Sequence, residues 1–184
     1  FLAATSEIFG EPAECPQSET TPVAPVNPYA AAKLYALNLV RVYRKAYGLF
    51  ACAGILFNHE SPRRGENYVT RKVARAAARI SRGLEKDVRL GTLSPRRDWG
   101  WAPDYVEGMR AILGASRPDE YVLATGETHS VGELCDLAFR SVGLDSRDHV
   151  VLDPSYGRPL DITETRGDAG KAHRLEQCRA GVQQ

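Results

Sequence analysis

Residues Leu49 to Phe57 read LFACAGILF, a continuous apolar run bounded by Gly48 and Asn58. A run without polar alternation is typical of a strand buried on both faces of a parallel sheet. We therefore predict a central buried strand here. The polar residues that follow it, from Asn58 to Gly65, should form a loop at its carboxyl end, where open α/β sheets bind their ligands.

Helical and extended patterns alternate on both sides of this run. Pro28 suits the first turn of a helix and Gly48 suits its end. Ser130 and Glu133 form a capping box, and Asp168 is placed to cap a final helix. Such alternation predicts an α/β fold. Expected strands are 1–4, 49–57, 88–91, 121–124 and 150–152; expected helices are 28–47, 68–82, 103–113 and 130–142.

Apolar spacing predicts which face of each helix is buried. The first should turn Leu34, Leu37, Val40 and Tyr43 inward, and the second, which is basic on its other side, Val69, Val73, Ala76 and Ile80. The third should bury Val106, Met109 and Leu113. Residues 10–26, rich in Pro, Glu, Ser and Thr, show no period and predict a surface loop.

Composition bounds the function. The chain has 184 residues, 43% hydrophobic and 26% charged, with a net charge of +1, which argues against a protein built mainly for nucleic acid. Four dispersed cysteines make a poor disulfide framework and a poor metal site, so we expect no metal and a reducing, cytoplasmic setting. No apolar run approaches the roughly 20 residues that span a bilayer. The strand-like start at Phe1 suggests a piece of a longer protein.

Tyr29 and Lys33 are the first candidate site residues, because four positions apart they share one helical face. A nearby ammonium favours the phenolate, so such a tyrosine can accept a proton from a hydroxyl. Thr5 and Glu7 follow the first strand and add a hydroxyl and a carboxylate. A chance surface pair and an ordinary helix cap are the alternative interpretations.

The loop after the central strand is dense in polar groups. Asn58 and His59 can hydrogen-bond a phosphate or a sugar, and Arg63 and Arg64 can hold an anion, or all four can belong to a solvated turn. A basic stripe on the second helix could bind RNA, although no aromatic platform accompanies it. The stripe comprises Arg71, Lys72, Arg75, Arg79 and Arg82.

Several stretches together resemble one family, the GDP-mannose 4,6-dehydratases of the extended short-chain dehydrogenase/reductase superfamily. The most specific is ILFNHESPRRGENYVTRK, from Ile55 to Lys72. The others are ATSEIFGEP (4–12), NPYAAAKLYA (27–36), RRDWGWAPDYV (96–106) and YVLATGETHSV (121–131). The resemblance runs from Ala4 to about Lys171 and implies the C-terminal part of a Rossmann-like parallel sheet plus a small α/β domain that binds a nucleotide sugar.

The resemblance also implies chemistry and residue roles. NADP would be the cofactor and GDP-mannose the substrate, oxidised at C4, dehydrated across C5 and C6, and reduced at C6 by the returned hydride. Tyr29, Lys33, Thr5 and Glu7 would be catalytic. Tyr29, Lys33, His59 and Arg64 would contact the cofactor. The substrate would be bound by Thr5, Asn58, Lys72, Arg97 and Arg158.

The implied organisation is a cofactor part over residues 1–60 and a mainly substrate-binding part over 61–184, with some segments returning to the first sheet. No Gly-rich dinucleotide turn is present, so we expect most of the cofactor site to lie outside this chain and the chain alone to be inactive. Asp161 stands where the family usually has glutamate, and the sequence departs from the family after Lys171.

Three expectations about partners and two alternative functions complete the prediction. We expect no nucleic acid, no membrane, and a homo-oligomer in the full-length parent. The nearer rival is a sister dehydratase acting on a GDP-heptose. The other is an inactive fragment that still binds nucleotide sugars.

Overall fold

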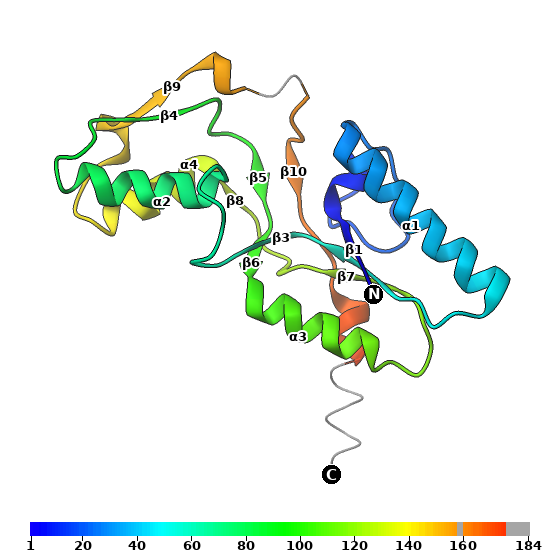
Figure 1. Ribbon diagram of the computed structural model, residues 1–184. Coiled ribbons are helices and arrows are strands. Elements are labelled where there is room, and N and C mark those ends of the chain that lie inside the picture. The colour runs from blue at the N-terminus through cyan, green and yellow to red at the C-terminus, as the bar shows by residue number, and fades with distance from the viewer. Residues whose placement is uncertain (158–159, 176–184) are drawn as a thin grey trace, which may run out of the picture. The chain divides into compact units, whose positions relative to one another are not determined.

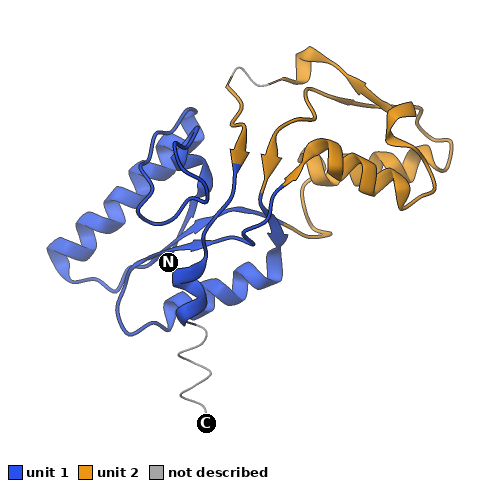
Figure 2. Ribbon diagram, turned by 180° about the vertical axis from the view of Figure 1, so that it is seen from behind, with its two compact units in different colours: residues 1–59, 98–128, 165–184 blue, residues 60–97, 129–164 orange. Residues whose placement is uncertain are grey.

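The computed structural model describes residues 1–157 and 160–175. They divide into two compact units (Figure 2). Unit 1 comprises Phe1–His59, Asp98–Thr128 and Thr165–Gln184, and unit 2 comprises Glu60–Arg97 and His129–Glu164. Each unit is built from segments that are distant in the sequence, so the chain passes repeatedly from one to the other.

Unit 1 is organised around a parallel sheet of strand order β1-β2-β7 (Figure 1). Its strands are β1 (Leu2–Thr5), β2 (Ala53–Leu56) and β7 (Glu120–Leu123). Ala53 is in register with Leu2 on one side and with Glu120 on the other, and all four residues of β2 are buried. The predicted central strand is therefore confirmed, and with it the α/β class.

The central strand is shorter than predicted. Leu49 and Phe50 are 48% and 50% exposed, and Ala51 N donates to Leu49 O at 2.8 Å in a turn. The apolar run thus contains a connecting turn as well as a strand. Hydrophobicity alone does not distinguish the two. At its other end, Asn58–Glu60 forms a short strand, β3, where a loop was predicted.

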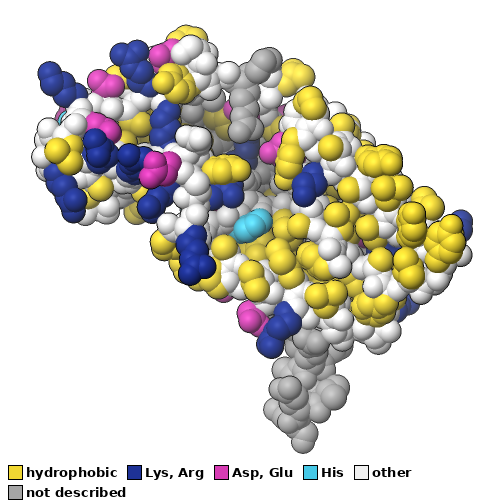
Figure 3. Space-filling model, viewed as in Figure 1, with side chains coloured by type: hydrophobic (Ala, Val, Ile, Leu, Met, Phe, Trp, Pro, Cys, Tyr) yellow, Lys and Arg dark blue, Asp and Glu magenta, His cyan; other side chains and the backbone are white. Residues whose placement is uncertain are grey.

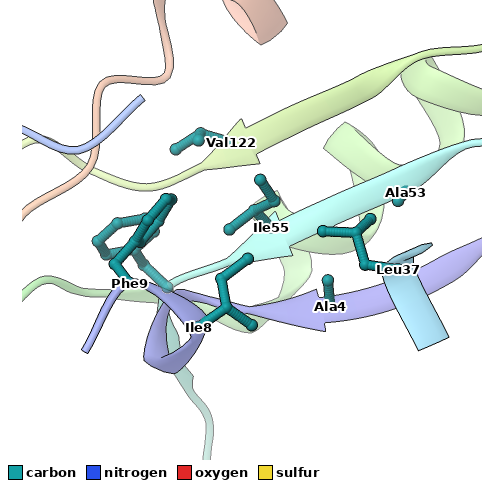
Figure 4. Packing of buried hydrophobic residues seen from close by; sticks show 8 residues of the cluster. Ala4, Ile8, Phe9, Leu37, Ala53, Ile55 and Val122 are labelled. Atoms are coloured by element: carbon teal, nitrogen blue, oxygen red, sulfur yellow. The ribbon is translucent and has the colours of Figure 1, made fainter. Parts of the chain in front are cut away.

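One face of the sheet is covered by α1 (Pro28–Tyr47). Asn27 caps its start and Gly48, at φ 63° in the left-handed region, ends it, as the sequence predicted. Leu37 packs into the fully buried cluster shown in Figure 4. Tyr43, predicted inward, is 49% exposed. The cluster contains Ala4, Ile8, Phe9, Leu37, Ala53, Ile55, Phe57 and Val122.

A second cluster of unit 1 involves α3 (Ala102–Leu113). Tyr105 and Ile112 are its inward residues, and Met109, predicted inward, packs against the same cluster. Val106 and Leu113 are 57% and 50% exposed, so the prediction is wrong for these two residues. The two pairs have the same spacing, so periodicity could not choose between adjacent stripes. Tyr105 and Ile112 pack with Cys52, Leu56, Tyr121, Leu123 and Ala172.

Unit 2 packs α2 (Val69–Ile80) against α4 (Val131–Arg140). The inward residues of α2 are Val73, Ala76, Ala77 and Ile80. Three of them were predicted, whereas Val69, also predicted inward, is only partly buried. The Ser130–Glu133 capping box is present, as predicted. A parallel pair, β4 (Val88–Leu90) and β9 (Val150–Leu152), completes the unit's longer elements.

Short strands join these elements where none was predicted. β3 pairs with β6 (Trp99–Trp101), and β5 (Arg96–Arg97) lies between β8 (His129–Ser130) and β10 (Glu164–Thr165). Pairings of two or three residues carry no sequence period, so only tertiary structure defines them. Three single-turn 3-10 helices, Ser6–Phe9, Ser146–Asp148 and Pro154–Tyr156, and a helical segment at 170–175 complete the described chain. Among the described helices, none has the length and apolarity to cross a membrane.

Candidate active site

Thr5 and Glu7 lie at the carboxyl end of β1. Thr5 ends the strand, is 8% exposed, and its hydroxyl oxygen accepts a hydrogen bond from Glu7 N at 3.3 Å. This contact caps the 3-10 turn Ser6–Phe9, so the turn places the Glu7 side chain just beyond the strand. One turn thus both forms a cap at Thr5, the alternative interpretation from the sequence, and carries Glu7, the candidate catalytic carboxylate.

Asn27 links Glu7 to the helix that carries Tyr29. Its Nδ2 donates to Glu7 Oε2 at 2.7 Å, and its Oδ1 accepts from Ala30 N at 2.8 Å. One amide side chain therefore orients the carboxylate and caps α1 at the same time. The sequence predicts the cap, because Asn27 precedes Pro28, but not the contact with a residue 20 positions earlier.

Tyr29 and Lys33 share one side of α1, as their spacing predicted. The Lys33 ammonium lies 5.7 Å from the centroid of the Tyr29 ring and donates to Ala3 O, on β1, at 2.9 Å. Tyr29 is 52% exposed. The structure thus holds a positive charge between a solvent-accessible phenol and the strand that ends in Thr5.

The loop between these groups is anchored, which the sequence did not predict. Gln17 is fully buried; its backbone N donates to Arg166 O at 2.7 Å and its Oε1 accepts from Arg166 N at 2.9 Å. Glu19 Oε1 accepts from Val122 N, on β7, at 2.8 Å. These contacts fix the connection between Glu7 and Asn27 to the rest of unit 1.

His59 and Asn58 belong to β3, directly after the central strand. His59 Nδ1 lies 2.9 Å from Phe57 O, so Nδ1 carries the proton and the lone pair of a neutral ring lies on Nε2. The ring stacks on Tyr105 at 4.8 Å. Burial, and then the charges of Asp98 and Asp104, raise the pKa of Tyr105, which keeps that ring neutral beside His59.

The remaining predicted residues lie in unit 2. Arg64 stacks its guanidinium 3.6 Å from the Tyr68 ring centroid, and its Nε lies 3.2 Å from Glu60 Oε2, an ion pair without hydrogen-bond geometry. Lys72 Nζ donates to Arg89 O at 2.6 Å and lies 4.1 Å from the Tyr156 ring centroid.

Lys72 and Tyr156 line a cavity of about 390 Å³ within unit 2. Its charged groups balance: Arg75 pairs with Glu66, and Arg89 lies 4.0 Å from Asp87. The cavity can therefore take a ligand with both polar and aromatic parts. Its lining is Glu66, Lys72, Arg75, Ala76, Glu85, Asp87, Val88, Arg89 and Tyr156.

Arg97 is bound within its own unit. It donates to Asp161 Oδ1 and to Ile162 O, each at 2.7 Å. Asp161 is the residue at which the sequence departs from the family, and here it neutralises Arg97. Arg158, predicted to act beside it, falls outside the described residues.

Contacts within unit 1 thus connect Thr5, Glu7, Asn27, Tyr29 and Lys33. Asn58 and His59 lie in the same unit, at the end of the neighbouring strand, whereas Arg64, Lys72 and Arg97 lie in unit 2. Within residues 1–157 and 160–175, no cluster of three or more His, Cys, Asp or Glu side chains could hold a metal ion.

A parallel sheet whose first strand ends at Thr5, beside a helix carrying Tyr29 and Lys33, places the chain in the short-chain dehydrogenase/reductase fold class. Solved structures agree. RMD from Pseudomonas aeruginosa, complexed with NADPH, matches with a TM-score of 0.85 at 24% identity, over 94% of this chain and 58% of its own. UDP-glucose 4-epimerase from Thermus thermophilus, in complex with NAD, matches with a TM-score of 0.80 at 27% identity, over 95% and 57%.

The chain belongs to the GDP-mannose 4,6 dehydratase family, whose pattern it matches over residues 1–176. GDP-mannose 4,6 dehydratase 1 of Arabidopsis thaliana is 52% identical over 175 residues, which are 95% of this chain and 48% of the plant protein. The human GDP-mannose 4,6 dehydratase is 45% identical over 189 residues, 94% and 51% of the two chains. This chain therefore spans about half the length of the curated relatives it matches.

Proposed function

We propose that this chain supplies the catalytic side chains of a GDP-mannose 4,6-dehydratase, which converts GDP-mannose to GDP-4-keto-6-deoxymannose. Family membership supports the reaction. The observation that carries the assignment of residues is the connected set of Thr5, Glu7, Asn27 and the first turn of α1. It brings a hydroxyl, a carboxylate and a phenol to one end of a parallel sheet.

Tyr29 is the proposed base for the first step. Its phenolate takes the proton of the 4-hydroxyl, and Lys33 places a positive charge beside the ring on which negative charge develops. The Thr5 hydroxyl orients the sugar oxygen by a hydrogen bond. Because Lys33 is also bound to Ala3 O, strand β1 holds the cation in place.

Glu7 is the proposed base for the dehydration. Once C4 is a ketone, the proton on C5 is acidic, and a carboxylate can remove it while the C6 hydroxyl leaves with a proton as water. The contact from Asn27 keeps one carboxylate oxygen hydrogen-bonded and so fixes the orientation of the other. A proton returns to C5 in the last step, so the net change is the loss of one water.

NADP is the proposed cofactor, and the residues present fit part of it. Lys33 and Tyr29 are donors at an accessible surface, and the cation of Arg64 is held against Tyr68, as suits an anionic group. When bound, the nicotinamide accepts the hydride from C4 and returns it to C6. The related structures complexed with NADPH and with NAD support a nicotinamide cofactor.

The nucleotide half of GDP-mannose is assigned to unit 2. Lys72 and Tyr156 in the cavity offer an ammonium and an aromatic ring. Arg97 is already paired with Asp161, so a diphosphate at that position must compete with the carboxylate. We propose Lys72 as the main diphosphate contact among the described residues of unit 2, with Arg158 as a further contact. Asn58, in unit 1, is a separate proposed contact of the nucleotide sugar.

A chimera tests this function. Residues 1–176 replace the matching part of the Arabidopsis relative, and the chimera is incubated with NADP and GDP-mannose. The product should be lighter by one water and, in heavy water, should carry deuterium at C5. Tyr29→Phe should lower turnover roughly 10²- to 10⁴-fold. Glu7→Gln should stop deuterium incorporation while the Michaelis constant stays near its original value. A chimera that folds without dehydrating GDP-mannose would refute the proposal.

An inactive binding fragment is the second candidate, because the chain spans about half of its relatives. It predicts that the isolated chain binds GDP-mannose in a calorimetric titration but never turns it over with added NADP. The same chimera, offered a GDP-heptose beside GDP-mannose, separates the dehydratase from a heptose-specific sister.

A further inference from the structure

The imidazole of His59 is held by two contacts of different kinds. Its Nδ1 lies 2.9 Å from Phe57 O, and because a carbonyl oxygen only accepts, Nδ1 carries the proton. The Tyr105 ring stacks on the imidazole, with 4.8 Å between the ring centroids and 26° between the ring planes. The hydrogen bond selects the protonated nitrogen, but a single bond leaves the ring free to tilt. The stack restrains that remaining motion.

The Tyr105 ring is bordered by a glycine that has no room for a side chain. Gly100 lies in β6, the strand that pairs with β3, to which His59 belongs. A Cβ at Gly100 would overlap the edge of the Tyr105 ring and would lie 3.1 Å from its Cζ. The ring can therefore lie where it meets His59 only because residue 100 is a glycine.

A buried carboxylate fixes the other neighbour of Gly100, which is Thr125. The same Cβ would lie 3.0 Å from Cγ2 of Thr125. Asp98 is fully buried, and its Oδ1 accepts from Thr125 N at 2.9 Å and from Thr125 Oγ1 at 2.7 Å. Its Oδ2 accepts from Gly126 N at 2.9 Å and from Gly167 N at 3.2 Å. Hydrogen bonds to an ionised group are strong, so the surroundings of the Tyr105 ring are rigid.

The hydroxyl of Tyr105 does not explain why a tyrosine lies in this core. Tyr105 is 5% exposed, and its hydroxyl is buried without a hydrogen-bond partner among the described residues. A buried donor of that kind costs stability. The contribution of Tyr105 therefore comes from its ring, and the stack on His59 extends that contribution to a candidate site residue.

The surface of unit 1 offers few charges that could orient the imidazole instead. Figure 3 shows hydrophobic side chains predominating over unit 1, with charged side chains scattered between them. Ring and backbone contacts therefore set the orientation of His59.

We propose that Tyr105 is a positioning residue of the cofactor site. Its ring, seated against Gly100, holds the His59 imidazole so that Nε2 is a fixed hydrogen-bond acceptor for a hydroxyl or an amide N–H of the nicotinamide nucleotide. A neutral imidazole whose Nδ1 is already engaged can accept such a donor only at Nε2. This inference rests on the proposed function, in which His59 contacts NADP. Tyr105 acts through His59 and needs no contact of its own with the cofactor.

The first test follows the His59 ring in the chain itself, without cofactor or turnover. Nitrogen NMR of the histidine side chains distinguishes a ring protonated at Nδ1 from one protonated at Nε2, and ring protons shift upfield when an aromatic ring stacks on them. A spectrum of His59→Gln identifies the His59 signals among those of the four histidines. We expect a His59 ring that is protonated at Nδ1, with upfield ring protons.

Four variants make the test specific. Tyr105→Leu should remove the upfield shift and let the two protonation forms of the ring interconvert. Gly100→Ala keeps both rings but should displace Tyr105, and so should alter the spectrum in the same way. Tyr105→Phe removes only the unpartnered hydroxyl and should retain the original spectrum. Ile112→Ala, in the same apolar cluster as Tyr105, is the matched control, which should lower thermal stability without altering the His59 signals.

The second test measures the affinity of the chimera for NADPH, without GDP-mannose. The fluorescence of the reduced nicotinamide reports binding directly. Tyr105→Leu and Gly100→Ala should raise the dissociation constant roughly 3- to 10-fold, because a lost aromatic stack is worth about that much. Tyr105→Phe and Ile112→Ala should leave it within about twofold of the original value. Circular dichroism confirms that each variant is folded.

Three results would overturn the inference. One is a His59 signal that neither Tyr105→Leu nor Gly100→Ala changes. Another is an altered signal with an unchanged affinity for NADPH. The third is an equal loss of affinity in Ile112→Ala and Tyr105→Leu, because damage to the core would then suffice. A chimera that shows the expected NADPH affinities but does not dehydrate GDP-mannose refutes the proposed reaction and leaves this inference intact.

Discussion

At the scale of the residue, Asn27 has two roles that one amide performs together. Its Oδ1 caps α1 and its Nδ2 holds the Glu7 carboxylate. Loss of a cap costs about 0.5–2 kcal/mol of stability, whereas release of a catalytic carboxylate changes reactivity. The two effects can be separated, because the chain contains a second capped helix, α4, whose cap Ser130 accepts from Glu133 N and does not hold Glu7.

Asn27→Ala and Ser130→Ala form a matched pair. Both remove a side-chain cap, so both should lower the free energy of unfolding by about 0.5–2 kcal/mol in chemical denaturation. In the chimera, Asn27→Ala alone should slow deuterium incorporation at C5, because Glu7 loses its orienting donor. Equal effects of the two variants on the exchange rate would show that Asn27 has no role beyond its cap.

At the scale of the element, α1 carries a buried leucine and a solvent-exposed leucine two positions apart, Leu37 and Leu39. Leu37 is fully buried in the sheet cluster, whereas Leu39 is 39% exposed. The helix therefore packs on the sheet through a narrow face.

Leu37→Ala should cost about 2–5 kcal/mol in the isolated chain, because it opens a cavity beneath the helix. Leu39→Ala should cost less than about 1 kcal/mol there, since its side chain already meets solvent. Thermal and urea denaturation of both variants measure the difference. Similar losses for the two would mean that Leu39 is also covered in solution.

The sequence predicted the elements better than their details. The order of strands and long helices followed from apolar runs and caps, because each signal is local. The inward face of α3 followed only for Met109, since Tyr105–Ile112 and Val106–Leu113 have the same spacing. In the candidate site, the spacing of Tyr29 and Lys33 predicted that they share one side of α1, but the bond from Asn27 to Glu7 and the pairing of Arg97 with Asp161 depend on the tertiary fold.

At the scale of the whole molecule, the two units each bury a cysteine that can report on opening. Cys52 in unit 1 and Cys135 in unit 2 are each 1% exposed, whereas Cys15 is exposed. Burial, and then the charge of Asp136, raise the pKa of the Cys135 thiol to about 11. Because the thiolate is the reactive form, labelling of Cys135 near pH 8 requires unit 2 to open.

In a Cys15→Ser, Cys178→Ser background, Cys135 should be labelled at a lower urea concentration than Cys52. Unit 2 contains less of the chain, and a smaller unit buries a smaller fraction of its surface. Mass spectrometry of digested, labelled protein follows the two thiols separately. Labelling of both at one urea concentration would show a single cooperative unit instead.

Raising the pH from about 9 to about 11 should destabilise unit 2, because unfolding frees the Cys135 thiol to ionise. Cys135→Ala should remove that contribution.

The bond from Glu19 to Val122 has a consequence for aggregation. Fibres grow when every added chain presents a fresh edge to the next, so a sheet must be open at both ends to propagate. At the β7 side of this sheet, the carboxylate of Glu19 occupies the Val122 amide that an added strand would need. A single acidic side chain in a connecting loop thus opposes misassembly through this edge.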